Sequence, residues 1–388
     1  MDNNVNKELF ELRQMTVPQL REKYFDVFGD ATGARHKGFL SYSSTSLYST
    51  YDNYYSQGRT YTHDLFVATG AGSVLDLSTL QSINAGFNDG DDDQNIQRIM
   101  ATAEGRIDLS GVKTITSPYR NSTDRLDIVV NTGGVVDLSG LRMISSARSG
   151  RSRFVVSTGG QLILGDIVKA EHVDFIVEDM GSLLRIDGNL NLSSSSSLSV
   201  PLLAGVEVTH SLIFHQTDET YIYLDKALLH MNGTGLQFLE IGGEDVGLPT
   251  ELGGSGNFGI GQLVVGDIGT PTTVELLDLI DNGNRGDGYE ALYLYGLGVN
   301  EDGLVLHEGS TLIVDHLDAY AWMDGDWVHL NDWLQDGMAP TTVAMGGRLM
   351  AFNPQAQSIT NTGMVPEPTV LALFVIGGML LLPCRWRR

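Results

Sequence analysis

The pattern of hydrophobic and polar residues divides the chain into segments of different character. In residues 1–40 apolar side chains recur at helical spacing, and Leu20, Tyr24 and Val27 fall on one face of a predicted helix. We therefore predict a short helical N-terminal segment over residues 1–40. Residues 41–59 are rich in serine and tyrosine, and we interpret them as a linker.

Residues 60–334 lose the helical pattern and show short Val, Ile and Leu runs separated by Gly, Asn, Asp and Ser. This pattern is typical of many short strands. Similar units recur, and Asp76, Asp108 and Asp137 occupy the same place in three of them, spaced by 32 and 29 residues. One unit cannot bury both faces of its strands, but units stacked in register can. The repeats predict an all-β body, an irregular β-solenoid similar to a parallel β-helix, with a β-sandwich as the alternative.

The end of this body carries a predicted hairpin, because Asp324-Gly325 suits a tight two-residue turn. Three aromatic residues, Tyr320, Trp322 and Trp327, flank that turn. They form either an aromatic platform for sugars or a cap hairpin that closes the end of the repeats, and we favour the cap. Residues 335–363 lose all pattern and are interpreted as a second linker.

The last residues of the chain are strongly apolar. Residues 369–382 are fourteen uncharged residues, which as a helix would extend about 21 Å. This is less than the roughly 30 Å hydrocarbon core, but local thinning of the bilayer lets a short helix span it. Arg385, Arg387 and Arg388 follow, and the positive-inside rule places them in the cytoplasm. We predict one C-terminal transmembrane helix, with residues 369–384 in the membrane.

A Pro-Glu-Pro step precedes this run, formed by Val365, Pro366, Glu367 and Pro368. With the apolar run and the arginine cluster, residues 364–388 resemble the PEP-CTERM sorting signal. The resemblance implies an exosortase-type processing enzyme as a partner, with recognition and cleavage at the Pro-Glu-Pro step. It also implies a precursor anchored in the inner membrane of the cell envelope, which is then released or attached at the cell surface.

The N-terminal segment does not fit this sorting route. Residues 12–37 resemble the start of a small bacterial family of unknown function, from which no activity carries over. Exported proteins of this kind begin with a secretory signal peptide, and no apolar signal region is visible in the first forty residues. The end of the resemblance after residue 37 predicts either a gene fusion or a misassigned start. The missing signal region leaves three alternatives: the true start lies elsewhere, export is lost, or the C-terminal segment alone inserts.

The amino-acid composition limits the classes of partner that the chain can bind. The formal net charge is −24 and the isoelectric point is about 4.5. Such a surface repels polyanions, so nucleic acid is not an expected partner. Cys384 is the only cysteine, which excludes a disulfide within the chain and any cysteine-based metal site.

The sequence of residues 60–334 gives only weak signals for a metal-binding or catalytic site. An acidic loop offers carboxylates that calcium prefers, but its spacing is not that of an EF-hand, and a solvated loop explains it as well. The weak calcium candidates are Asp89, Asp91, Asp92 and Asp93. His316 lies between Asp315 and Asp318 without a second set of ligands. We predict no catalytic residues, no metal site and no cofactor, with calcium as the one alternative.

Polysaccharide-active enzymes also use β-helices, with clustered acids and a basic residue. Here basic residues are few, and Lys113, Arg120, Lys169 and Arg185 have no evident partners. We therefore predict a non-enzymatic, exported cell-surface or extracellular-matrix protein with a structural or adhesive role, for which extracellular polysaccharide is a candidate partner. The alternatives are a polysaccharide-active β-helix enzyme and a calcium-dependent adhesin.

Overall fold

The computed structural model describes most of the central part of the chain. The described residues are 39–43, 46–50, 60–86, 94–118, 124–146, 150–249, 257–281, 290–298, 301–314, 317–334, 341–342 and 346–351. The chain divides into two compact units, Met1–Ala351 and Phe352–Arg388, and all of these residues belong to the first. The predicted helix around Leu20 and the predicted membrane segment, residues 369–384, lie outside the described residues.

The described residues are almost entirely β, which confirms the predicted fold class at this level. One sheet has 13 strands and a second has 18, and strand pairing is parallel except at β1–β2, β28–β29 and β30–β31. Two short 3₁₀ turns, η1 (Glu219–Tyr221) and η2 (Leu330–Trp333), interrupt the strands. Within the described ranges no helix is long and apolar enough to cross a membrane.

The strands pair in three ladders, each of which takes about one strand from every repeat. Ladder A is the 13-stranded sheet: β1 (Phe39–Ser43), β2 (Ser46–Thr50), β5 (Ser82–Asn84), β8 (Thr114–Ser117), β11 (Met143–Ser146), β14 (Ile167–Ala170), β17 (Leu190–Leu192), β20 (Leu212–Phe214), β22 (Leu236–Glu240), β24 (Thr273–Leu277), β27 (Thr311–Val314), β31 (Arg348–Ala351) and β30 (Thr341–Thr342).

The 18-stranded sheet contains the other two ladders, which share β21 (Ile222–Met231) and β23 (Gly259–Val265). Ladder B also contains β3 (Thr60–Thr69), β6 (Gln94–Thr102), β9 (Arg125–Val130), β12 (Arg151–Val156), β15 (Val173–Val177), β18 (Ser197–Ser199), β25 (Ala291–Leu294), β28 (Asp318–Met323) and β29 (Asp326–His329). Ladder C also contains β4 (Val74–Asp76), β7 (Arg106–Asp108), β10 (Val135–Leu138), β13 (Gln161–Leu164), β16 (Leu183–Ile186), β19 (Ala204–Val208) and β26 (Leu304–Leu306).

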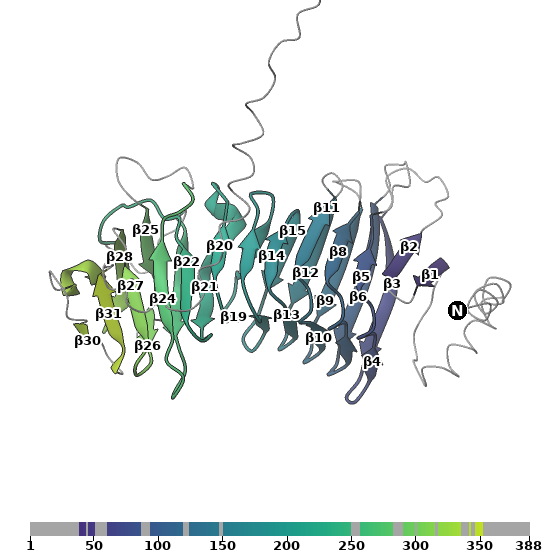
Figure 1. The fold of residues 1–388 in the computed structure, drawn as a ribbon, viewed down its shortest axis with the longest axis horizontal. Helices are drawn as coiled ribbons and strands as arrows, with labels where there is room; N and C mark the ends of the chain where they lie inside the picture. The colour runs from purple at the N-terminus through teal and green to yellow at the C-terminus, as the bar shows by residue number, and fades with distance from the viewer. Residues whose placement is uncertain are drawn as a thin grey trace, which may run out of the picture. The chain divides into compact units, whose positions relative to one another are not determined.

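Successive repeats are aligned residue by residue over most strands, with register shifts at β3–β6, β14–β17 and β21–β23. In ladder C, Asp76 lies opposite Asp108 and Asp108 lies opposite Asp137, so the repeat alignment read from the sequence is confirmed. Figure 1 shows the strands following one another in chain order, from β3 in purple to β31 in yellow-green. Each repeat therefore packs mainly against the repeats immediately before and after it.

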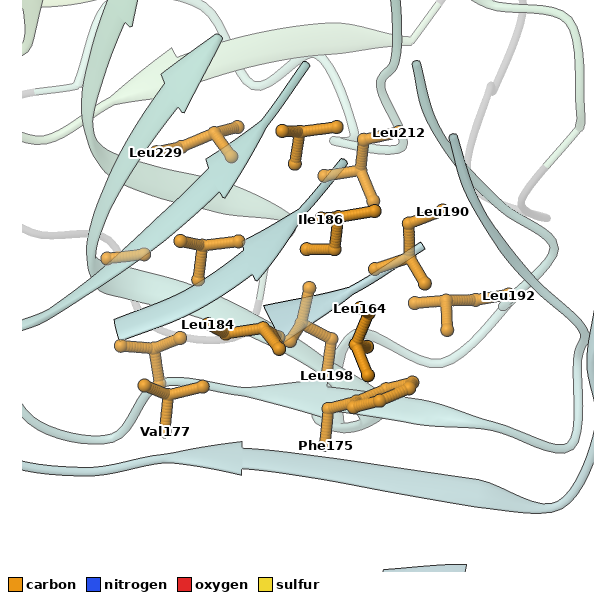
Figure 2. Close-up of a cluster of buried hydrophobic side chains, with 14 of the residues drawn as sticks. Leu164, Phe175, Val177, Leu184, Ile186, Leu190, Leu192, Leu198, Leu212 and Leu229 are labelled. Carbon is orange, nitrogen blue, oxygen red and sulfur yellow. The ribbon is translucent and has the colours of Figure 1, made fainter. Parts of the chain in front are cut away.

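The core lies between the three ladders. Strands alternate buried and partly exposed positions, as in β12, because successive side chains point to opposite faces of a sheet. Figure 2 shows inward side chains from all three ladders meeting in one cluster, such as Leu192 of ladder A, Phe175 of ladder B and Leu164 of ladder C. Phe175 stacks on Phe154 with 5.0 Å between ring centroids. Each fully buried side chain of this size contributes about 2 kcal/mol through the hydrophobic effect.

The sheets extend beyond the segment predicted as the body. Strand β1 begins at Phe39, so the last two residues of the predicted helical segment are in a strand, because they pair with β2. Strand β2 lies in the predicted linker 41–59 and pairs with β5. Strand β31 lies in the predicted linker 335–363, where Leu349 alternates with more exposed neighbours and is buried against the core. Two stretches without a clear repeat therefore still add strands to ladder A.

Candidate functional site

The residues with the clearest functional prediction lie outside the described part of the chain. These are the predicted sorting motif (Val365, Pro366, Glu367, Pro368), the arginines predicted to orient the membrane segment (Arg385, Arg387, Arg388), and the weak calcium candidates Asp89, Asp91, Asp92 and Asp93. His316 and Arg120 lie outside it as well. Among the residues that are described, no group of three or more His, Cys, Asp or Glu side chains could hold a metal ion.

The outer face of ladder B carries a row of alternating charges. From β3 to β15, one outward position per strand is occupied in register by Asp64, Arg98, Asp127, Arg153 and Asp174. Parallel strands repeat at about 4.8 Å, so each charge lies next to charges of opposite sign. We call these five residues the charged row.

Ion pairs satisfy the charged row within the sheet. Arg98 Nε lies 2.6 Å from Asp64 Oδ1, and Arg153 Nη2 lies 3.4 Å from Asp127 Oδ2. Asp127 is 3% exposed and also contacts Arg125, whose Nε lies 2.9 Å from its Oδ1. Burying a carboxylate this deeply is tolerated because two guanidinium groups compensate its charge.

Asp174, at the end of the charged row, binds Arg151. The Arg151 guanidinium donates two hydrogen bonds to this carboxylate, and Ser197 Oγ donates a third at 2.7 Å. The hydrogen bond with Asp174 raises the pKa of Arg151 above its usual value, although partial burial opposes the effect. Because this arginine stays charged, it cannot act as a general base.

Beside the charged row runs a second outward row, which is apolar. Its members are aligned from β3 to β15 and are partly exposed: Val67, Met100, Val129, Val155 and Ile176. It continues through Ser199 to Tyr223 of β21. Tyr223 is 36% exposed, and Tyr221, which interacts electrostatically with Arg151, is 44% exposed.

We call Arg151, Asp174, Ser197, Tyr221 and Tyr223 the tyrosine patch. It combines aromatic rings with a paired guanidinium and carboxylate and a hydroxyl group. Tyrosine offers an apolar ring and a polar tip on one rigid side chain. Such a surface suits a sugar, whose C–H faces are apolar and whose rim carries hydroxyl groups.

Ladder C carries a shallow groove on its outer face. The hollow has a volume of about 410 Å³, and Gly205 lies between Leu183 and Leu228 on its floor. Its lining includes one acidic residue, Glu301, and no basic residue. A pair of converging acids with a base, which a polysaccharide-active β-helix enzyme would need, is not found in this groove.

The predicted hairpin is present at the end of ladder B. Strands β28 and β29 pair antiparallel around Asp324 and Gly325, whose φ angles of 51° and 87° suit a type I′ turn. The flanking Tyr320 and Trp327 are only 5% and 8% exposed. A sugar platform needs open ring faces, so their burial favours the cap over the platform.

These rings belong to a small aromatic cluster on the outer side of the sheet. Tyr320 stacks on Tyr293 at 5.0 Å and on His329 at 4.8 Å between ring centroids. Tyr320 Oη donates a hydrogen bond to Asp245 at 3.0 Å, and Val246 N donates one to Tyr293 Oη at 2.8 Å. Burial raises the pKa of both tyrosines, that of Tyr293 to about 12. The cluster, which also includes Tyr295 and Trp327, is thus a second core built from aromatic rings.

No protein-family model, curated protein or solved structure matches this chain. Function is therefore inferred from the chemistry of the residues themselves.

Two basic residues that lacked a visible partner in the sequence have one in the structure. Lys169 Nζ lies 2.7 Å from Glu171, and Arg185 Nε lies 2.7 Å from Asp187. Both acids are two residues further along the same outward face, so strand alternation would have located them. The tyrosine patch had no such local signal, because its members come from different repeats.

One titratable group stands apart from these pairs. Asp225 lies where β21 shifts register between ladders B and C, and burial raises its pKa to about 7. Its charge interacts with Tyr295 of the aromatic cluster. A perturbed pKa alone does not identify a catalytic site, because structural groups are perturbed by burial as well.

Proposed function

We propose that this chain is a non-enzymatic, exported protein of the cell surface or extracellular matrix, sorted by residues 364–388 and with an irregular β-solenoid as its body. The solenoid is supported by strand registers in which each repeat pairs with the next one along the chain. The sorting route is supported by the Pro-Glu-Pro step, the apolar run and the terminal arginines.

The adhesive role is assigned to the tyrosine patch. The observation that carries it is that the charges around the patch are paired within the sheet while Tyr221 and Tyr223 stay exposed. Such a surface binds without donating or removing protons. With a net charge of −24, the chain repels acidic polymers, so the expected ligand is a neutral polysaccharide.

Binding of neutral polysaccharides to the purified chain tests the adhesive role. Tyr223→Ala is expected to weaken retention on a polysaccharide affinity gel about tenfold, since a stacked ring contributes on the order of 1–2 kcal/mol. Tyr223→Phe keeps the ring and should retain binding. Leu236→Ala removes a similarly exposed side chain from ladder A and serves as the matched control. Equal retention of all three variants would reject the patch.

Mass spectrometry of the protein recovered from cells tests the sorting route. Loss of all residues after the Pro-Glu-Pro step, on protein at the surface or in the medium, is the expected result. A cytoplasmic protein with an intact C-terminus would contradict the proposal. The calcium-dependent adhesin stays an alternative, and a rise in melting temperature at millimolar calcium would favour it.

A further inference from the structure

Ladders B and C start with strands that have a partner on one side only. Strand β3 pairs with β6, and β4 pairs with β7, and neither pairs with another described strand. Ladder A differs, because the antiparallel hairpin β1–β2 closes it at the same end. An open strand edge exposes backbone N–H and C=O groups and is a site for pairing or covering by another segment.

Side chains at this end are apolar and less covered than their counterparts in the next repeats. Leu75 is only partly buried, whereas Ile107 and Val136, which continue its row, are fully buried. Leu77 and Phe66 are also partly buried against the core, whereas Ile99 of β6, which pairs with Phe66, is 0% exposed. Among the described residues, the first layer of ladders B and C therefore has a neighbouring layer on one side only.

We infer that the N-terminal segment, residues 16–29, supplies this cover by packing its apolar face on β3 and β4. The apolar face is formed by Leu20, Tyr24 and Val27. The segment fits because stacked repeats need terminal elements that are apolar on one side and polar on the other.

The position of the segment in the chain supports this occupant. Residue 38 leads directly into β1, which β2 joins to β5, and β5 belongs to the same repeat as β3 and β4. The segment is therefore tethered to the end that it would cover. A short tether gives a local concentration in the millimolar range, so even weak packing is largely formed.

Net charge favours the N-terminal segment over a second copy of the chain as the occupant of this end. Residues 1–37 carry six basic and six acidic residues, a net charge of zero. A second copy carries a net charge of −24 and would meet the same charge on the first. Electrostatics thus favour the neutral, tethered segment over end-to-end association.

Hydrogen–deuterium exchange on the full chain tests the inference. In the variant Leu20→Ser/Val27→Ser, amide exchange in β3 and β4 should speed up about tenfold, because the cover is lost. The matched control, Glu22→Ser/Asp26→Ser, changes the opposite face of the predicted helix and should leave exchange unchanged. Exchange in β10 and β13, several strands away, should be the same in all variants, which verifies that the body stays folded.

Light scattering on the same samples shows whether the N-terminal segment or a second copy of the chain covers β3 and β4. A monomeric parent in which β3 exchange responds to the apolar-face variant supports the inference. Unchanged exchange in β3 and β4 would overturn it. The inference would also be overturned if the parent were a dimer and amide exchange in β3 sped up when that dimer dissociated on dilution, but not on substitution.

Discussion

Gly159 and Gly160, in the turn before β13, allow a sharp test of how the repeats pack. Gly159 has a φ of +74°, and a Cβ placed on it would have its nearest neighbour, Gly133 N, at 4.0 Å. Gly160 does not have a positive φ, but its Cβ would lie 2.4 Å from the carbonyl oxygen of Val130 in the preceding repeat. One position therefore probes backbone conformation and the other probes the contact between repeats.

The two glycines should respond differently to alanine. Gly159→Ala places an L-residue in the left-handed region, which costs about 1 kcal/mol. Gly160→Ala brings carbon and oxygen about 1 Å closer than the roughly 3.3 Å at which such atoms meet. The Cβ is fixed rigidly to its own Cα and the carbonyl of Val130 is backbone, so relief requires two repeats to separate. We expect a loss near the upper end for overpacking, about 3 kcal/mol.

Urea unfolding followed by far-ultraviolet circular dichroism and tryptophan fluorescence measures both variants. We expect the midpoint of Gly160→Ala to fall about three times as far as that of Gly159→Ala, provided that the slopes agree. Equal shifts, or a larger shift for Gly159→Ala, would refute the close packing of residue 160 against the preceding repeat.

Three further predictions concern charges and rings. Asp127→Ala leaves two guanidinium groups unpaired and should lower the free energy of unfolding by about 3 kcal/mol. Arg185→Ala removes one partner of an exposed pair and should change that free energy by less than about 1 kcal/mol. The midpoints of urea unfolding of the two variants test this difference. Burial raises the pKa of Asp225 from 3.8 to about 7, so the stability associated with its protonated form is complete below pH 3.8 and is lost as the pH rises to about 7. Asp225→Asn should remove that loss, and thermal melts at pH 4 and pH 8 should then differ less than in the parent. Tyr320→Phe removes the hydrogen bond to Asp245 and should cost about 1 kcal/mol, against about 4 kcal/mol for Tyr320→Ala; a similar fall in melting temperature for both would contradict a packed ring stack.

Much of the parallel β body could be predicted from local pattern. Short apolar runs and turn residues identified the strands, and the recurring Asp76, Asp108 and Asp137 predicted the register between repeats. The register was predictable because each repeat adds a strand of similar sequence to the same ladder. Residues at equivalent places in two repeats therefore lie opposite each other. The strands outside the repeats, β2 and β31, had no such pattern and were interpreted as linkers.

The candidate site was much less accessible to the sequence. Asp127 and Arg153 are 26 residues apart, and Tyr320 and Asp245 are 75 residues apart. Nothing in the local pattern of either residue specifies its partner. The ring of Trp327 packs edge-on against Tyr295, which directly follows β25, so its burial could not be read from the hairpin alone.

By itself, the sequence predicted most strands of the repeats, the alignment of Asp76, Asp108 and Asp137 between repeats, and an acidic body with few basic residues. The predicted sorting signal at residues 364–388 rests on the sequence alone, because a short linear motif can be read without a fold. Only the tertiary structure decided which charges pair, which aromatic rings are covered, and that Tyr221 interacts with Arg151. The reason is physical: alternation along a strand follows from backbone geometry, whereas side-chain neighbours across repeats depend on how three ladders stack around one core.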